Sequence, residues 1–351
     1  MTQHILTGGT GFVGSHLLAD LLAGDPADTV RALARGNAEG SAAERIDAAL
    51  AAAGASPAAS DPRLTVVESE LTAPLCGVDP ATVARGDGPL VFWHLAASLQ
   101  WRKGQREQIF RTNVEGTKQA LELAASLGAD LFVYVSTAYT CGALHGDIAE
   151  ELHRPPAFSN VYEESKCAAE HVVAGAEGGP RTLILRPSVI VGSSVDFRPS
   201  GSYSGLYGYL SELRKFKEML GDSEESVRYT ADRAARISFI PVDHVVADAR
   251  AVVNAELAQP SRDIYHLTGR SESAVGDMTD YLLKLLALQD RLCITSEEIP
   301  DPTMLEKFFA KRIEFFADYM RREKRFVRTA APDRAVHIHE ITKYIDAENR
   351  L

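Results

Sequence analysis

The sequence predicts an α/β fold with a doubly wound parallel sheet and a smaller, mostly helical C-terminal part. Short apolar runs alternate with helical stretches through the first half of the chain, as in a parallel sheet that is covered on both faces. A glycine-rich turn joins the first apolar run to the first helix. The chain has 351 residues, of which 45% are hydrophobic, so it can bury a large core.

The expected elements follow one another in a regular order. A short strand at His4–Thr7 leads into a helix at Phe12–Ala23, and Val30–Ala34 is expected to form the second strand. The alanine-rich stretch Ala42–Ala53 has a high helix propensity. Further strands are expected at Leu64–Glu68, Leu90–Leu95, Leu131–Ser136 and Thr182–Leu185, with helices near Thr112–Ser126 and Tyr162–Ala174.

The pattern loosens after Gly192. A stretch rich in glycine and tyrosine at 201–209 is better suited to shaping a pocket than to filling a core. One strand, Ile237–Ile240, is expected to return to the sheet, and the remainder is expected to be mainly helical. We therefore expect residues 1–192, with 237–248 returning to them, to form the sheet domain. Residues 193–236 and 249–351 are expected to form the substrate-binding part.

Composition and charge exclude several classes of function. The chain has 37 basic and 48 acidic residues and a net charge of −11, which argues against a general binder of nucleic acids or anionic membranes. Its start does not resemble a signal peptide, and it contains no apolar run of about 18 residues that would span a membrane. Its four cysteines lie far apart, without metal-ligand spacing. We expect a soluble cytoplasmic protein with no nucleic-acid partner, no integral membrane segment and no metal site.

The first chemical signal is the sequence Thr7-Gly-Gly-Thr-Gly-Phe-Val-Gly14, which follows a strand and begins a helix. Glycines at this spacing allow a tight turn, and they let the backbone approach a pyrophosphate at the positive end of the helix. The turn therefore predicts a Rossmann-type dinucleotide-binding domain. The residues expected to hold the cofactor here are Gly8, Thr10, Gly11, Phe12, Val13 and Gly14.

The end of the second strand indicates which dinucleotide fits. An NAD site usually has an acidic residue about 20 residues after the last glycine, but this chain has Arg35 there. An arginine suits the extra phosphate of NADPH in both geometry and charge. Arg45, on the next helix, is a second candidate contact. The alternative is that both arginines are ordinary solvated side chains.

The second chemical signal is Tyr162-Glu-Glu-Ser-Lys166. An offset of four places both end residues on one helix face. A nearby ammonium favours the phenolate of a tyrosine, whose pKa starts near 10, so the pair predicts an acid/base group that works near neutrality. Upstream, Ser136 and Thr137 end a strand with hydroxyls suited to binding a substrate oxygen. Each element alone is more often structural, but together and after a dinucleotide turn they predict catalysis.

In these motifs the chain resembles the extended short-chain dehydrogenase/reductases. The matching motifs are the glycine turn, His94-Leu-Ala-Ala97, Asn113-Val-Glu-Gly-Thr117, Ser136-Thr137 and Tyr162-x-x-x-Lys166. The resemblance implies that Thr137, Tyr162 and Lys166 form the catalytic triad and that Asn113 supports a proton relay. It further implies that Ala96 and Ala97 line the cofactor, that Pro187 and Ser188 lie beside the nicotinamide, and that Lys166 also holds the cofactor. Glu70-Leu71 replaces the Asp-Leu pair with which family members commonly hold the adenine.

Several details are more similar to the thioester reductases and fatty acyl-CoA reductases than to the sugar-nucleotide epimerases. They include Leu33-Ala-Arg35, Leu71-Thr-Ala-Pro-Leu75, Ala96-Ala-Ser-Leu-Gln-Trp101 and Arg186-Pro-Ser-Val-Ile-Val-Gly192. This resemblance implies that NADPH reduces an acyl thioester to an aldehyde or alcohol. No adenylation or carrier domain is recognisable, so the acyl group is expected to arrive as a CoA ester or on an acyl carrier protein.

Three other functions remain open from the sequence. The first is an NADPH-dependent ketone or aldehyde reductase that acts on a polyketide-like or other small carbonyl substrate. The second is a sugar-nucleotide epimerase or dehydratase, which a phosphate-binding arginine disfavours. The third is a sensor or scaffold protein that binds NADPH without turnover. The four-residue spacing of Tyr162 and Lys166 argues against a sensor, because a protein that only binds NADPH does not need these two side chains on one helix face.

The C-terminal stretch Thr303–Arg328 has eight basic residues against four acidic ones, although the whole chain is acidic. Leu305, Phe309, Phe316 and Met320 recur at helical spacing, which predicts a helix with one buried face and one cationic face. Its cations are either simply solvated or form a docking surface for an acyl carrier protein or for the phosphates of CoA.

Overall fold

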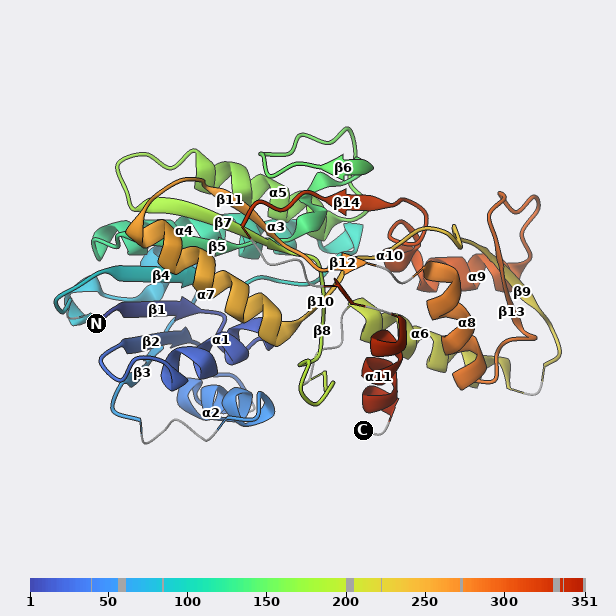
Figure 1. Ribbon diagram of the computed structural model, residues 1–351, viewed down its shortest axis with the longest axis horizontal. Coiled ribbons are helices and arrows are strands. Elements are labelled where there is room, and N and C mark those ends of the chain that lie inside the picture. Colours follow the sequence, from blue (N-terminus) through green and yellow to red (C-terminus); the bar gives the residue numbers. More distant parts are fainter. Residues whose placement is uncertain are drawn as a thin grey trace.

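The computed structural model describes residues 1–38, 40–55, 61–83, 85–199, 205–221, 223–271, 274–330, 335–336 and 338–349. A seven-stranded parallel sheet forms its larger part (Figure 1). This arrangement confirms the predicted fold class. In sheet order, the strands are β11 (Ile264–Leu267), β7 (Arg181–Pro187), β5 (Leu131–Val135), β4 (Leu90–His94), β1 (Gln3–Thr7), β2 (Thr29–Ala34) and β3 (Leu64–Glu68).

Helices cover both faces of the sheet. On one face, α1 (Phe12–Ala23), α2 (Ala42–Ala52) and α7 (Val242–Ala258) bury aliphatic side chains in one core. On the other face, α4 (Gly116–Ser126) and α5 (Val161–Ala174) bury theirs in a second core. The strands are apolar along most of their length because both of their faces are covered.

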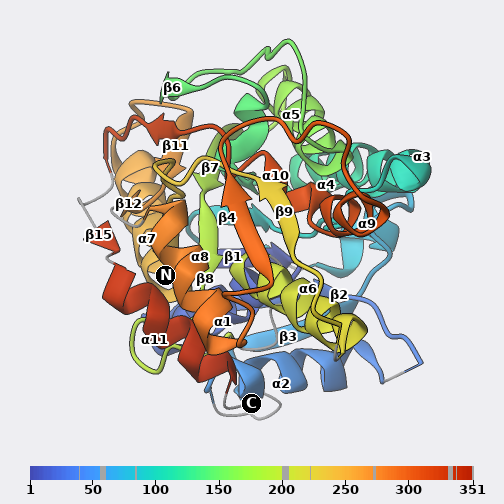
Figure 2. The same ribbon diagram turned by 90° about the vertical axis from the view of Figure 1, so that its right-hand side faces the viewer.

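A smaller part lies beside the carboxyl ends of the strands (Figures 1 and 2). It has an apolar core of its own, which includes Phe216, Phe309 and Ile341. Its helices are α6 (Gly205–Leu220), α8 (Val275–Leu285), α9 (Met304–Arg312), α10 (Glu314–Ala317) and α11 (Ile338–Asn349). Its two-stranded ladders are β9 (Val227–Thr230) with β13 (Leu292–Thr295), and β12 (Arg270–Ser271) with β15 (Ala335–Val336).

Two elements differ from the sequence expectation. The strand expected at Ile237–Ile240 forms as β10 (Phe239–Pro241), but it pairs with β8 (Val189–Val191) instead of joining the main sheet. The strand that joins the sheet after Gly192 is β11, which pairs with β7. The stretch expected to be mainly helical therefore contributes an edge strand to the main sheet. This strand was hard to recognise in the sequence because it contains the polar residue His266.

The expected helix over Thr303–Arg328 is also broken. It ends at Arg312, continues briefly as α10, and becomes strand β14 (Lys324–Phe326), which pairs with β6 (Gly146–Ile148). Phe309 and Met320 are buried as expected, but Phe309 lies in α9 and Met320 lies in the turn that follows α10. Of the glycine- and tyrosine-rich stretch, residues 201–204 lie outside the described residues, and the rest begins α6.

No helix in the described part of the chain is both long and apolar enough to cross a membrane. The same residues contain no group of three or more histidine, cysteine, aspartate or glutamate side chains placed to hold a metal ion. Cys76, Cys141 and Cys167 are buried free thiols, whereas Cys293 is exposed.

Candidate active site

The glycine turn forms a cradle at the end of β1. Gly8 has φ +78°, and a Cβ atom there would lie 2.6 Å from the backbone nitrogen of Ala96. A Cβ on Gly14 would collide with the carbonyl of Gly8, so both positions require glycine. No side chain caps the first turn of α1, which begins after Gly11. This cradle fits a pyrophosphate, because the amides of an uncapped helix start attract an anion.

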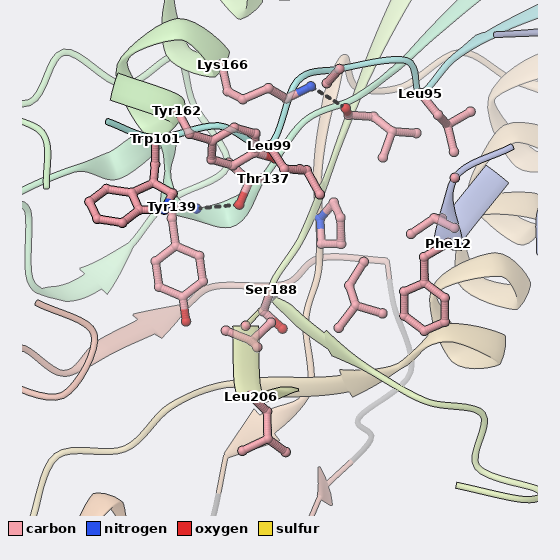
Figure 3. A pocket seen from close by; sticks show the side chains of 18 of the residues that line it. Phe12, Leu95, Leu99, Trp101, Thr137, Tyr139, Tyr162, Lys166, Ser188 and Leu206 are labelled. Atoms are coloured by element: carbon pink, nitrogen blue, oxygen red, sulfur yellow. Dashed lines mark hydrogen bonds between the residues drawn. The ribbon is translucent and has the colours of Figure 1, made fainter. Parts of the chain in front are cut away.

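A cavity of about 880 Å³ extends from this turn across the carboxyl ends of the central strands. Figure 3 shows Phe12 and Leu95 at one end, Trp101 and Tyr139 at the other, and Thr137, Tyr162, Lys166 and Ser188 between them. Of the residues expected to bind the cofactor, those that line the cavity are Gly8, Thr10, Gly11, Phe12, Val13, Gly14, Ala97, Lys166, Pro187 and Ser188. The topology therefore brings together motifs that lie far apart in the sequence.

The three residues of the expected triad line the same cavity. Tyr162 and Lys166 come from the first turns of α5, whose start is capped by the side chain of Asn160. Thr137 follows β5, and its Oγ1 accepts a hydrogen bond from the backbone N–H of Tyr139 at 3.3 Å. The ammonium of Lys166 donates to the carbonyl of Val135 at 2.7 Å, and it lies 4.1 Å from the centre of the Tyr134 ring.

The electrostatics of Tyr162 differ from the sequence expectation. Burial raises the pKa of Tyr162 above its usual value, and the carboxylate of Glu163 adds to the rise. Burial also lowers the pKa of Lys166 to about 7, which the carboxylate of Glu170 partly opposes. Desolvation is therefore the main cause of the raised pKa of Tyr162, and the side-chain nitrogen of Lys166 donates to Val135. The phenol therefore keeps its proton at neutral pH and is suited to donating it.

Two buried hydroxyls in the cavity wall have no hydrogen-bond partner within the described structure. They are the Oγ atoms of Ser136 and Ser188. Buried polar atoms are seldom left unpaired in proteins, so such a pair beside Tyr162 indicates a polar ligand. Ser188 lies where the sequence placed the nicotinamide contact, and Ser136 precedes Thr137. The hydroxyls and the glycine cradle together fit a dinucleotide that spans the cavity.

Asn113 does not line the cavity. It lies in a π-helical turn, Arg111–Glu115, and its side chain holds the segment that follows β4. Its Oδ1 accepts from the N–H of Ser98 at 2.7 Å, and its Nδ2 donates to the carbonyl of Ser98 at 3.0 Å and to Ser165 Oγ at 2.9 Å. The structure thus places Asn113 as a brace between two walls of the cavity. Its role in a proton relay stays a prediction.

Arg35, Arg45 and Glu70 form a separate cluster at the ends of β2 and β3. Arg35 is largely exposed and contacts Glu70 at 3.3 Å, while Arg45 donates to the carbonyl of Arg35 at 2.6 Å. Burial opposes the charge of Glu70, but hydrogen bonds from Thr72 and Arg35 hold its pKa below the usual value. The expected phosphate-binding arginine is therefore already paired with the expected adenine contact. Leu71 packs against Gly116 of α4, and the backbone N–H of Ala96 contacts Thr7 Oγ1 at 3.3 Å.

The comparisons with known proteins identify the family. A family model described as male sterility protein, which is an NAD-binding family, matches residues 6–249. The chain belongs to this family. The match covers most of the sheet domain, including the glycine turn, Thr137, Tyr162, Lys166 and helices α1 to α5, whereas strand β11 lies beyond it.

Two relatives and one solved structure are similar to this chain over different shares of its length. A 3-beta-hydroxysteroid dehydrogenase of Mycolicibacterium neoaurum is 32% identical over 200 residues, which are 54% of this chain and 47% of that protein. The L-2-aminoadipate reductase large subunit of Eremothecium gossypii is 29% identical over 301 residues, which are 80% of this chain and 21% of that protein. The terminal R domain of the myxalamid PKS-NRPS pathway has a TM-score of 0.73 at 20% identity, with 99% of this chain and 90% of that one covered.

These findings confirm the resemblance to extended short-chain dehydrogenase/reductases and to their thioester reductase and fatty acyl-CoA reductase branch. Residues 6–249 therefore form an NAD-binding domain of this family. It spans about half of the first relative and about a fifth of the second.

Sequence reasoning missed most of the far wall of the cavity in this family member. That wall is mainly aromatic and aliphatic and comes from both parts of the fold: Leu99, Trp101, Tyr139, Leu206, Tyr209, Ile237, Phe239, Met278, Phe315, Phe316, Tyr319 and Met320. Trp101 contacts Phe315, and Tyr139 contacts Tyr319, with ring centres 5.5 Å and 4.5 Å apart. Two signals were usable. The glycine- and tyrosine-rich stretch at 201–209 was expected to shape a pocket, and its Leu206 and Tyr209 line the cavity. The apolar repeat after Thr303 was the other, and we interpreted it as a helix face.

Proposed function

We propose that the protein is an NADPH-dependent reductase that transfers hydride to the carbonyl carbon of an acyl thioester and yields an aldehyde or alcohol. The thioester is carried by CoA or by an acyl carrier protein. One observation carries the proposal: Thr137, Tyr162 and Lys166 share a single cavity with a glycine cradle at one end and an apolar wall at the other. The similarity to the aminoadipate reductase and to the R domain supports the choice of substrate.

Each residue has a defined role in this reaction. NADPH, when bound on the glycine cradle, supplies the hydride. Thr137 and Tyr162 hydrogen-bond the carbonyl oxygen and stabilise the negative charge that develops on it. Tyr162 donates a proton to that oxygen, because its raised pKa keeps the phenol protonated. Lys166 lies one helical turn from Tyr162 and orients the cofactor, together with Ser136 and Ser188.

The division of labour between the two parts of the fold belongs to the same proposal. Residues 1–192, with 237–248, hold the cofactor, and residues 193–236 and 249–351 bind the substrate, except that the end of α7 and strand β11 belong to the sheet domain. The cavity lining supports this division, because the glycine turn and the triad come from the first part whereas Tyr209, Met278 and Phe316 come from the second. The buried free cysteines suit a reducing compartment, which supports a cytoplasmic location.

A ketone or aldehyde reductase is the second candidate. The similarity to the 3-beta-hydroxysteroid dehydrogenase favours it, since that name describes chemistry at an alcohol or ketone. The same triad serves either reaction. The difference lies in the leaving group, because a thiolate must depart from a reduced thioester.

An NADPH-oxidation assay with three substrate classes tests the proposal. The classes are acyl-CoA esters, acyl-carrier thioesters and free ketones or aldehydes. Turnover of a thioester with release of free thiol supports a thioester reductase, and one or two NADPH consumed per thioester distinguishes an aldehyde from an alcohol product. Turnover of free ketones without any turnover of thioesters contradicts the proposal and supports the second candidate.

A further inference from the structure

The segment that follows β4 forms one rim of the cavity. Leu99, Gln100 and Trp101 line the cavity, and Leu99 is nevertheless 59% exposed. A large apolar side chain that both lines a cavity and faces solvent marks the place where the cavity opens. Figure 3 shows Leu99 and Trp101 close to Tyr162.

This rim is held in place by several contacts. The carbonyl of Trp101 accepts from the backbone N–H of Val161 at 3.3 Å, immediately before Tyr162. Asn113 brackets Ser98 with two hydrogen bonds, and the Trp101 ring contacts Phe315. The rim therefore keeps a defined position relative to the catalytic tyrosine.

Two exposed cations follow directly on this rim. The guanidinium of Arg102 lies 5.5 Å from the centre of the Trp101 ring, and Lys103 is the next residue. Across the described residues, neither forms an ion pair with a carboxylate. Arg106 differs, because it contacts Glu164 at 2.6 Å. In a chain with a net charge of −11, two uncompensated cations at a cavity mouth attract an anion.

We propose that Arg102 and Lys103 form a phosphate subsite that binds the phosphate of the phosphopantetheine arm carrying the acyl thioester. The inference rests on the proposed function and adds a recognition site to it. The arm has amides and a hydroxyl but no charge between its thiol and its phosphate. The uncharged arm therefore lies along the apolar rim, and its phosphate contacts Arg102 and Lys103 at the mouth of the cavity. The same phosphate occurs in CoA and in carrier proteins, so the subsite serves both donors.

The test compares octanoyl-phosphopantetheine with octanoyl-pantetheine, which lacks the phosphate. The wild-type protein should have a KM about fivefold or more lower for the phosphorylated thioester, the scale expected for two exposed charge pairs. The double variant Arg102→Gln/Lys103→Gln should lose this preference. In the wild type, the preference should also shrink in high salt, because ions screen exposed charges. The matched control is Lys307→Gln/Lys311→Gln, which removes two exposed cations from α9 and should keep the preference.

Each outcome separates the subsite from the proposed function. Equal KM values for the two thioesters in the wild type overturn the subsite and leave the thioester reductase standing. Loss of the preference in the α9 control alone places the phosphate on the C-terminal cations and also overturns it. If the wild type reduces neither thioester, the proposed function fails. Calorimetric titration with phosphopantetheine and pantetheine then tests the subsite directly, and equal affinities for the two overturn it.

Discussion

At the residue scale, burial controls the chemistry of Tyr162 more than its lysine neighbour does. The pKa of Tyr162 is raised, and the ammonium of Lys166 faces Val135 and Tyr134. A tyrosine that holds its proton is a suitable acid for reduction, where a proton must be delivered to an oxygen. The pairing of tyrosine and lysine therefore works here through geometry, with both groups in one cavity wall.

Tyr162→Phe should keep cofactor binding and lower the kcat for ketone reduction by about 10² or more, the usual scale for the loss of a positioned acid. Thioester reduction should fall less, because a thiolate departs with little need for protonation. Steady-state kinetics with both substrates, together with cofactor titration by fluorescence, check this. Full activity toward every substrate would remove Tyr162 from the catalytic set.

Arg35 is expected to select NADPH, but its contact with Glu70 complicates the selection. Arg35→Gln should weaken NADPH binding by about tenfold, the scale of a hydrogen bond to a charged group, and leave NADH binding unchanged. Titration of each cofactor by fluorescence measures this. Equal losses for NADPH and NADH would show that Arg35 is outside the phosphate site.

Glu70→Gln is the matched variant for the same cluster. If Glu70 only neutralises Arg35, its loss should strengthen the binding of NADPH and not that of NADH. If Glu70 holds the adenine, as the resemblance implies, both cofactors should bind more weakly. The two roles thus give opposite results for NADPH in one titration.

At the scale of elements, the C-terminal segment from α10 to β14 closes the cavity. Phe315, Phe316, Tyr319 and Met320 line it. The segment is tied to the catalytic helix, because the hydroxyl of Tyr319 donates to Glu163 Oε1 at 2.7 Å. It is tied again where Ser159 Oγ donates to Asp318 at 2.5 Å, and where β14 pairs with β6. A helix over this stretch would not have made these contacts.

Tyr319→Phe should raise the KM for large acyl substrates several-fold and affect small aldehydes less, because it removes the hydrogen bond that ties the cavity-closing segment to helix α5. The substitution keeps the aromatic ring. The buried side chain of Glu163 loses a donor, which costs about 1–3 kcal/mol of stability. Kinetics with substrates of two sizes and thermal unfolding check both effects. Tyr281→Phe is the control, because Tyr281 also donates to a carboxylate, Asp346, but does not line the cavity. An equal rise in KM in both variants would contradict the role of Tyr319 in the wall.

At the scale of the whole molecule, the charge is distributed very unevenly. The chain has 48 acidic residues, yet no aspartate or glutamate lies among the described residues that line the cavity, and Lys166 is the one lysine or arginine there. Two tyrosine hydroxyls of the far wall already have protein partners: that of Tyr319 in Glu163 and that of Tyr209 in Tyr229. The acyl part of a substrate therefore enters an environment without a countercharge.

An apolar acyl group should be reduced with a kcat/KM at least about 100-fold higher than one of equal length that ends in a carboxylate. The physical reason is that an unpaired carboxylate loses its hydration on entering such a wall, which costs several kcal/mol. Hexanoyl and adipoyl thioesters of the same thiol provide the comparison. Equal kcat/KM values would mean that the chain end stays in solvent or finds a cation elsewhere.

The fold could be predicted from the sequence wherever the signal was local. Strand β3 and helix α1 have the bounds that periodicity predicted, and the glycine turn and the Tyr162–Lys166 register lie where their motifs placed them. In these cases a few neighbouring residues carry both the backbone preference and the chemistry. Strand β11 was missed because it is short and contains a histidine, which is buried against the rest of the fold.

The sequence by itself determined the glycine turn, the spacing of Tyr162 and Lys166 and the class of fold, because each depends on residues close together in the chain. Only the tertiary structure decided what faces them. Glu163 and Tyr319 are separated by 156 positions, and Trp101 meets Phe315 across a still longer stretch of the chain. Such contacts depend on how two cores pack against each other, and no local pattern records that packing. For the same reason, the apolar repeat after Thr303 indicated burial of Phe309 and Met320 correctly, but Phe309 packs in the core of the smaller part whereas Phe316 and Met320 line the cavity.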